Sequence, residues 1–112
     1  MVSAEALLRI KRYAGSSPNR EICGVVDTQD NVYPIINVST VPSDFVLSRS
    51  GYGRALRTIK GLGQVIKCVY HSHLNGDAAP SIHDLASSAA SHYDYLIVAG
   101  DIHTYTVCGE VH

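Results

Sequence analysis

The stretch that decides the fold reads His71-Ser-His-Leu-Asn-Gly-Asp-Ala-Ala-Pro-Ser-Ile-His-Asp84. Residues 64–70, directly before it, are rich in β-branched and apolar side chains, which predicts a buried strand. Side chains two positions apart in a strand leave from the same face. If the strand continues through His71 and His73, both imidazoles can therefore reach one metal ion.

The second half of this stretch predicts the start of a helix. Ser81 is a candidate N-cap, and Asp84 then lies in the first turn, facing back towards the end of the strand. Two imidazoles and one carboxylate form a three-ligand set with a fourth position left for water, the usual composition of a catalytic zinc site. The alternative is purely structural, because His-x-His occurs at sheet edges and Ser-x-x-Asp is an ordinary helix start.

The whole chain, residues 1–112, is predicted to form one mixed α/β domain with a single core. Apolar periodicity and turn residues indicate helices and strands in alternation. The expected elements are a helix from Ser3 to about Tyr13, strands 20–26 and 32–38, a short strand or extended segment 45–47, a helix 50–60, a strand 64–70, a helix from Ser81, and strands 93–99 and 102–108. Pro34 suggests an edge or a bulge for the second strand.

Composition excludes several classes of partner. A net charge of −1 provides no basic surface for nucleic acid or anionic lipid. No apolar run approaches the roughly 18 residues of a membrane-spanning helix, and the N-terminus lacks the apolar core of a secretory signal. Cys23, Cys68 and Cys108 form no Cys-x-x-Cys pair and lie in apolar runs, so we expect reduced, buried thiols in a cytoplasmic protein. Cys68 as a metal ligand is an alternative, but its register points it away from His71.

A zinc hydrolase also needs a group that accepts a proton from water. The chain contains only three glutamates, which are Glu5, Glu21 and Glu110. Glu5 lies on an amphipathic helix, and Glu110 lies near a chain end that is expected to fray. Glu21 precedes an apolar strand, where partial burial would raise its pKa. The alternative for Glu21 is a surface carboxylate at the end of a strand.

The spacing His-x-His-x(7)-Ser-x(2)-Asp resembles the motif of the JAMM (MPN+) metalloprotease family. Glu21-Ile-Cys-Gly24 is similar to the Glu-x-Cys-Gly segment that lies upstream of it in that family. The resemblance implies an MPN/JAB (cytidine-deaminase-like) fold, a curved mixed β-sheet flanked by helices. It also implies the roles of the site residues: His71, His73 and Asp84 hold one Zn²⁺ ion, Glu21 is the general base, and Ser81 hydrogen-bonds the oxyanion.

The family cleaves peptide or isopeptide bonds, so the resemblance implies a protein or peptide substrate, a ubiquitin-like protein among the candidates. The segment Ser43–Ser48 and the short helix after it look most like the tail assembly protein K branch of tailed phages. That branch implies phage tail proteins as partners and the host cytoplasm or the virion tail as location. Leu74 stands where the family commonly has Pro, and we expect specificity to depend on residues 74–80 and 40–52. A non-catalytic MPN assembly module is the alternative function.

Overall fold

The structure is a computed structural model that describes residues 2–106. It contains one five-stranded sheet and three helices within that range. In chain order the elements are α1 (Ala4–Gly15), β1 (Cys23–Asp27), β2 (Val32–Ile35), α2 (Arg49–Gly61), β3 (Ile66–Ser72), α3 (Ile82–Ser91), β4 (Asp94–Ala99) and β5 (Ile102–Thr106). The strand order is β2-β1-β3-β4-β5, and only β3 and β4 run parallel to each other.

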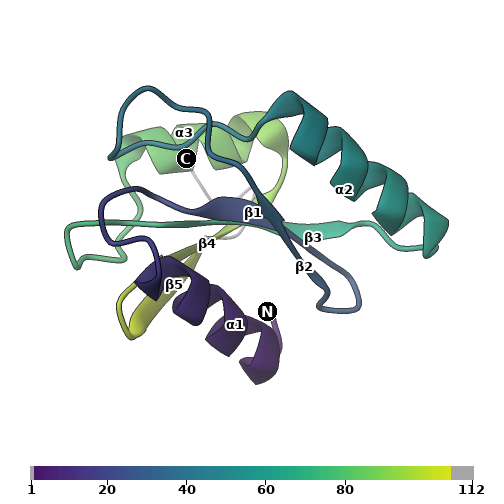
Figure 1. The fold of residues 1–112 in the computed structure, drawn as a ribbon, viewed down its shortest axis with the longest axis horizontal. Helices are drawn as coiled ribbons and strands as arrows, with labels where there is room; N and C mark the ends of the chain where they lie inside the picture. The colour runs from purple at the N-terminus through teal and green to yellow at the C-terminus, as the bar shows by residue number, and fades with distance from the viewer. Residues whose placement is uncertain (1, 107–112) are drawn as a thin grey trace.

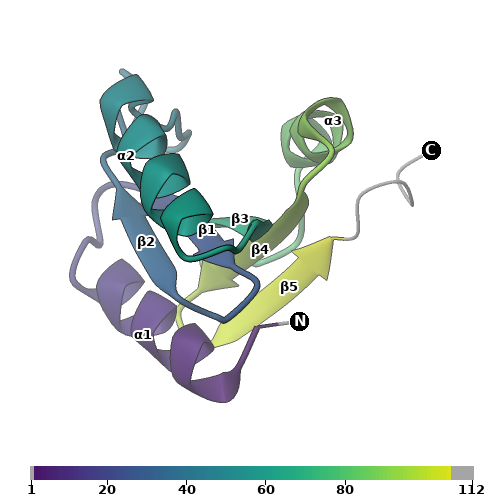
Figure 2. The ribbon, with the colours of Figure 1, turned by 90° about the vertical axis from the view of Figure 1, so that its right-hand side faces the viewer.

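Helix α1 covers one face of the sheet, and α2 and α3 lie over the other (Figures 1 and 2). Alternation along the strands supplies a core to each face. Val26 and Cys68 pack with Ile10 of α1, whereas Val25 and Val69 pack with residues of α2. The sheet is therefore buried on both sides at its centre.

The parallel pair positions the candidate site. Because parallel neighbours cannot be joined by a tight turn, the chain crosses from β3 to β4 through α3. The N-terminus of α3 consequently lies near the carboxyl end of β3, where ligands commonly bind in open α/β sheets. This is the end of β3 that carries His71 and His73.

The predicted α/β (α+β mixed) class is confirmed, and so is the order of the main elements. Ser3 caps α1 as predicted, since its hydroxyl accepts the Ala6 N–H, and β2 with its Pro34 lies at a sheet edge. Two strand boundaries were wrong. β1 begins at Cys23 instead of residue 20, and β2 ends at Ile35 instead of residue 38.

Residues 45–47, predicted to be a short strand or an extended segment, form no strand of the sheet. After Ile35 the chain leaves the sheet. Its residues then pair with a later part of the same loop, through an isolated antiparallel bridge between Asn37 and Leu47. The Val38 N–H donates to the Val46 carbonyl at 2.9 Å. We call residues 36–47 the β2–α2 loop. The last two residues of the predicted strand 102–108 lie outside the described range.

Two further predictions concern the cysteines and membranes. Cys23 and Cys68 are free thiols with 0% exposure, as predicted, whereas Cys108 and Glu110 lie outside the described residues. Cys68 packs in the cluster with Ile10 on the α1 face, so it is not a partner of His71. Within residues 2–106, no helix combines the length and the apolar character needed to span a bilayer.

Candidate metal centre

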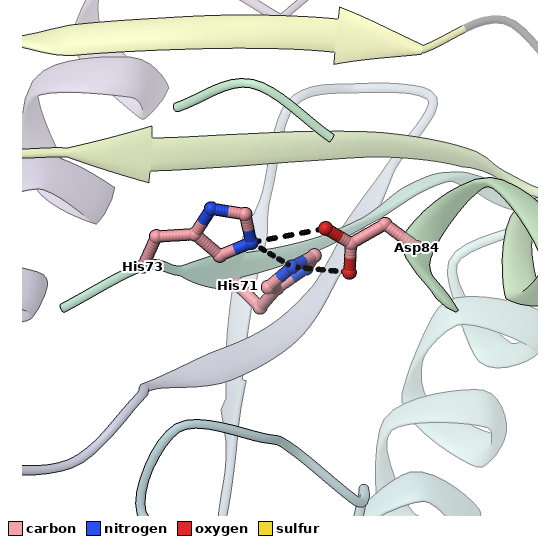
Figure 3. A group of neighbouring side chains, drawn as sticks. All are labelled: His71, His73 and Asp84. Atoms are coloured by element: carbon pink, nitrogen blue, oxygen red, sulfur yellow. Dashed lines mark hydrogen bonds and ion pairs between the residues drawn. The ribbon is translucent and has the colours of Figure 1, made fainter. Parts of the chain in front are cut away.

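The end of β3 brings the two predicted histidines together. His71 belongs to β3, and the His73 N–H donates to the Val98 carbonyl at 2.9 Å, so pairing with β4 continues past the strand. Their Nε2 atoms lie 3.3 Å apart (Figure 3). The His71 side chain has 0% exposure and that of His73 has 14%. The prediction that both rings leave the same face is therefore confirmed.

The first turn of α3 aims the Asp84 carboxylate at these rings (Figure 3). A capping box holds it: Ser81 Oγ accepts the Asp84 N–H at 3.0 Å, and Asp84 Oδ2 accepts the Ser81 N–H at 2.9 Å. Asp84 Oδ1 lies 3.0 Å from His71 Nε2, and Oδ2 lies 3.0 Å from His73 Nε2. The helix cap thus orients the carboxylate towards the histidines.

The spacing of these donor atoms fits one small divalent cation. Each of the three residues offers a ligand atom, and these atoms all lie within 4.8 Å of one another. A tetrahedral zinc ion with bonds of about 2.0–2.1 Å separates its ligand atoms by roughly 3.3 Å. The 3.3 Å between the two Nε2 atoms agrees with that value, and each Nε2 lies 3.0 Å from a different oxygen of Asp84. A His₂Asp set leaves one position open in such a geometry.

The hydrogen-bond pattern indicates that this cluster needs an additional positive charge. His73 Nδ1 lies 2.9 Å from the Asp77 carbonyl, which only accepts, so Nδ1 carries the proton. In a neutral ring His73 Nε2 is then a lone pair facing the Asp84 oxygen at 3.0 Å. Two acceptors at that distance repel unless a proton or a metal ion lies between them. The Nδ1–H contact to a carbonyl is also the usual support of a metal-bound histidine.

Burial and hydrogen bonding set the charges of the other two groups. Burial lowers the pKa of His71 and outweighs the nearby Asp84 carboxylate, so the ring stays neutral. Burial alone would raise the pKa of Asp84. The hydrogen bond from His71 and the backbone hydrogen bond from Ser81 help to outweigh it, and the pKa of Asp84 is lowered. An ionised carboxylate beside a neutral imidazole is a protonation state that can bind metal.

Glu21 lies beside these ligands through the pairing of β1 with β3. Cys23 pairs with His71, and continuing this antiparallel register places Glu21 opposite His73. Two hydrogen bonds show that the pairing continues beyond Cys23. The Ile22 N–H donates to Ser72 Oγ at 2.9 Å, and the Ser72 N–H donates to the Ile22 carbonyl at 3.1 Å. Residues directly opposite each other share a face of the sheet.

The side chain of Glu21 is buried, and it lines an open cleft of about 430 Å³ together with His73, Ser81 and Asp84. Burial raises its pKa from 4.5 to about 7. A protonated His73 would oppose this rise, whereas the charges of Asp84 and Asp44 add to it. A carboxyl group with a pKa near neutrality is suited to accept and return a proton.

Sequence reasoning missed the contribution of the β2–α2 loop. Phe45 stacks on His71, with ring centroids 4.2 Å apart and planes inclined by 19°. Asp44 lines the cleft and lies 3.9 Å from His83. The His83 side chain is exposed, and it also lines the cleft. No spacing in the sequence connects this loop to the histidines, although the expectation that residues 40–52 shape the substrate site pointed to it.

Comparisons with known proteins support the fold alone. No family model matches this chain, and no curated protein matches it. The chain is similar to a protein from Desulfitobacterium hafniense, known from a solution structure, with a TM-score of 0.74 and 20% identity over 93% of this chain and 79% of that one. It is also similar to a protein from Salinibacter ruber, with a TM-score of 0.63 and 22% identity over 97% and 82% of the two chains. The site must therefore be interpreted from its own geometry.

Proposed function

We propose that this chain is a zinc-dependent peptidase or isopeptidase of the JAMM (MPN+) type, with the MPN/JAB version of the α+β fold. The substrate is a protein or peptide amide bond, with a ubiquitin-like protein or a phage tail protein as the partner that the sequence resemblance favours. The observation that carries the proposal is the convergence of His71, His73 and Asp84 at 3.0–3.3 Å beside a buried glutamate.

The three side chains would hold the zinc ion. When bound, zinc supplies Lewis-acid chemistry: it lowers the pKa of water and polarises the carbonyl group of the substrate. The Asp84 carboxylate and the lone pairs of both Nε2 atoms would face the ion. The His73 ring would stay oriented by its Nδ1–H bond to the Asp77 carbonyl.

Glu21 would transfer a proton at the reacting bond, and Ser81 would stabilise the negative charge that forms there. Glu21 would take the proton of the attacking water and return it to the leaving amine, which its pKa of about 7 makes possible in both directions. Ser81 Oγ uses a lone pair to cap α3, so its O–H can still donate to the oxyanion. A single donor of this kind contributes about 3 to 4 kcal/mol in the transition state.

Metal content and a Glu21 variant test the proposal together. We expect about one zinc per chain by elemental analysis of protein refolded with zinc, and hydrolysis of a mixed library of quenched peptides and lysine-branched isopeptides. Glu21→Gln is expected to keep the zinc and the fold while hydrolysis is lost. If the variant loses zinc instead, Glu21 is a ligand and these roles are wrong.

The same measurements separate the enzyme from a non-catalytic assembly module. A chain that takes up no zinc supports the module, and so does a zinc-loaded chain that hydrolyses no member of the library. Glu5→Gln is the matched control, because Glu5 is an exposed residue of α1, outside the cleft. It is expected to change neither zinc content nor hydrolysis.

A further inference from the structure

The two candidate histidine ligands differ in what fixes their rings. His73 Nδ1 bonds to the Asp77 carbonyl at 2.9 Å. His71 Nδ1 is buried and has no hydrogen-bond partner among the described residues. Metal-bound histidines almost always donate their second N–H to an acceptor, which orients the ring. Something else must therefore hold the His71 ring.

Aromatic rings occupy the surroundings of His71. The Phe45 ring lies over the imidazole with centroids 4.2 Å apart and planes inclined by 19°, which is a stacked arrangement. Tyr95 meets the imidazole edge-on, with centroids 5.7 Å apart and an angle of 77°. Aromatic pairs of these geometries add about 0.5–1.5 kcal/mol beyond the area that they bury. Rotation of the imidazole about its Cβ–Cγ bond would disrupt both contacts.

We propose that Phe45 is a positioning residue for His71, whose stacked ring takes the place of the missing hydrogen bond at Nδ1. The inference rests on the proposed zinc site and deepens it. When Phe45 holds the imidazole ring in this orientation, His71 Nε2 stays directed at Asp84 Oδ1, 3.0 Å away. The Nδ1 side is closed to water, since the His71 side chain has 0% exposure.

The β2–α2 loop is braced so that Phe45 keeps this place. The Asn37 side chain donates to the Glu21 carbonyl at 2.9 Å and to the Asp44 carbonyl at 3.0 Å. Its oxygen accepts the Val46 N–H at 3.0 Å. One amide side chain therefore ties the residues on both sides of Phe45 to the backbone of Glu21. The backbone of Glu21, the proposed general base, and the loop that carries Phe45 are therefore held in a fixed position relative to each other.

Zinc affinity measures this role without any need for a substrate. We expect Phe45→Ala and Phe45→Leu to weaken Zn²⁺ binding about 10- to 100-fold, the range for residues that orient metal ligands. Phe45→Tyr keeps a stacking ring and should bind zinc within about threefold of the parent. Competition with a chromophoric chelator gives the dissociation constants. Val46→Ala is the matched control, since Val46 is the next residue of the loop and is 50% exposed.

A Co²⁺ spectrum and a folding control complete the test. Cobalt-substituted Phe45→Leu should show altered visible bands, whereas the Val46→Ala bands should match the parent. Thermal unfolding in chelator identifies any variant that does not fold, and Phe45→Leu then replaces Phe45→Ala. Parental zinc affinity and parental cobalt bands in folded Phe45→Leu would overturn the inference. A parent chain that binds no zinc would instead overturn the proposed function itself.

Discussion

Glu21→Gln should stabilise the metal-free protein at alkaline pH. The Glu21 pKa is raised by burial to about 7 in the folded chain, against 4.5 when the chain is unfolded. Between these values the unfolded chain has released the proton and the folded chain still holds it. Stability therefore falls as the pH rises from about 4.5 to about 7 and is level above that. The values differ by about 2.5, and each pKa unit corresponds to about 1.4 kcal/mol, so ionised Glu21 costs about 3 kcal/mol.

The assay is urea unfolding in chelator, with the parent and the variant compared at pH 4.5 and pH 8. We expect equal stabilities at pH 4.5 and an advantage of about 3 kcal/mol for Glu21→Gln at pH 8. The exposed Glu5→Gln control should change stability by less than about 1 kcal/mol at either pH. The same difference between parent and Glu21→Gln at both pH values would refute the claim that Glu21 is buried with a raised pKa.

Three further variants test separate parts of the site. Asp84→Asn keeps a cap acceptor for the Ser81 N–H, whereas Asp84→Ala does not, so urea unfolding in chelator should find Asp84→Ala about 1 kcal/mol less stable than Asp84→Asn. Both variants should bind zinc more weakly by a factor larger than the roughly 100-fold that supporting residues cost. Ser81→Ala should bind zinc but hydrolyse about 10²- to 10³-fold more slowly, with Ser81→Thr near the parent in a rate assay. Gly24→Ala should lose about 3 kcal/mol by urea unfolding, because its Cβ would lie 2.3 Å from the Tyr33 carbonyl and the Tyr70 hydroxyl, and Tyr70→Phe should restore part of that loss.

Much of the fold follows from local patterns. Ser3, Ser48 and Ser81 cap the three helices, and the first and third were predicted from the same short signal. β3 and β4 are apolar runs because both faces of a parallel pair are covered. The early end of β2 could not be predicted, since residues 36–38 have the composition of a strand and leave the sheet only because the chain pairs with residues 46 and 47.

Some residues of the candidate site could likewise be predicted from local sequence patterns, and others could not. His71, His73 and Asp84 could be found because a strand repeat and a helix cap fix their directions over a short stretch. Glu21 was a candidate from its place before an apolar strand and from the resemblance, but its position opposite His73 depends on the pairing of β1 with β3, which no local pattern predicts. The resemblance pointed to residues 40–52 but not to Phe45 itself, because its contact with His71 depends on a loop that is held by the side chain of Asn37.

The residues of the candidate metal centre are held in place by contacts within the protein chain. The α3 cap fixes Asp84, the Asp77 carbonyl fixes His73, and the Ile22–Ser72 pairing fixes the backbone next to Glu21. The arrangement of charges at this site is unfavourable without a cation: a neutral His73 would present a lone pair to the Asp84 carboxylate, and Glu21 stays protonated up to about pH 7. A cation between the imidazoles and Asp84 would remove the repulsion at His73 Nε2 and lower the pKa of Glu21, so the charges of this site favour metal binding.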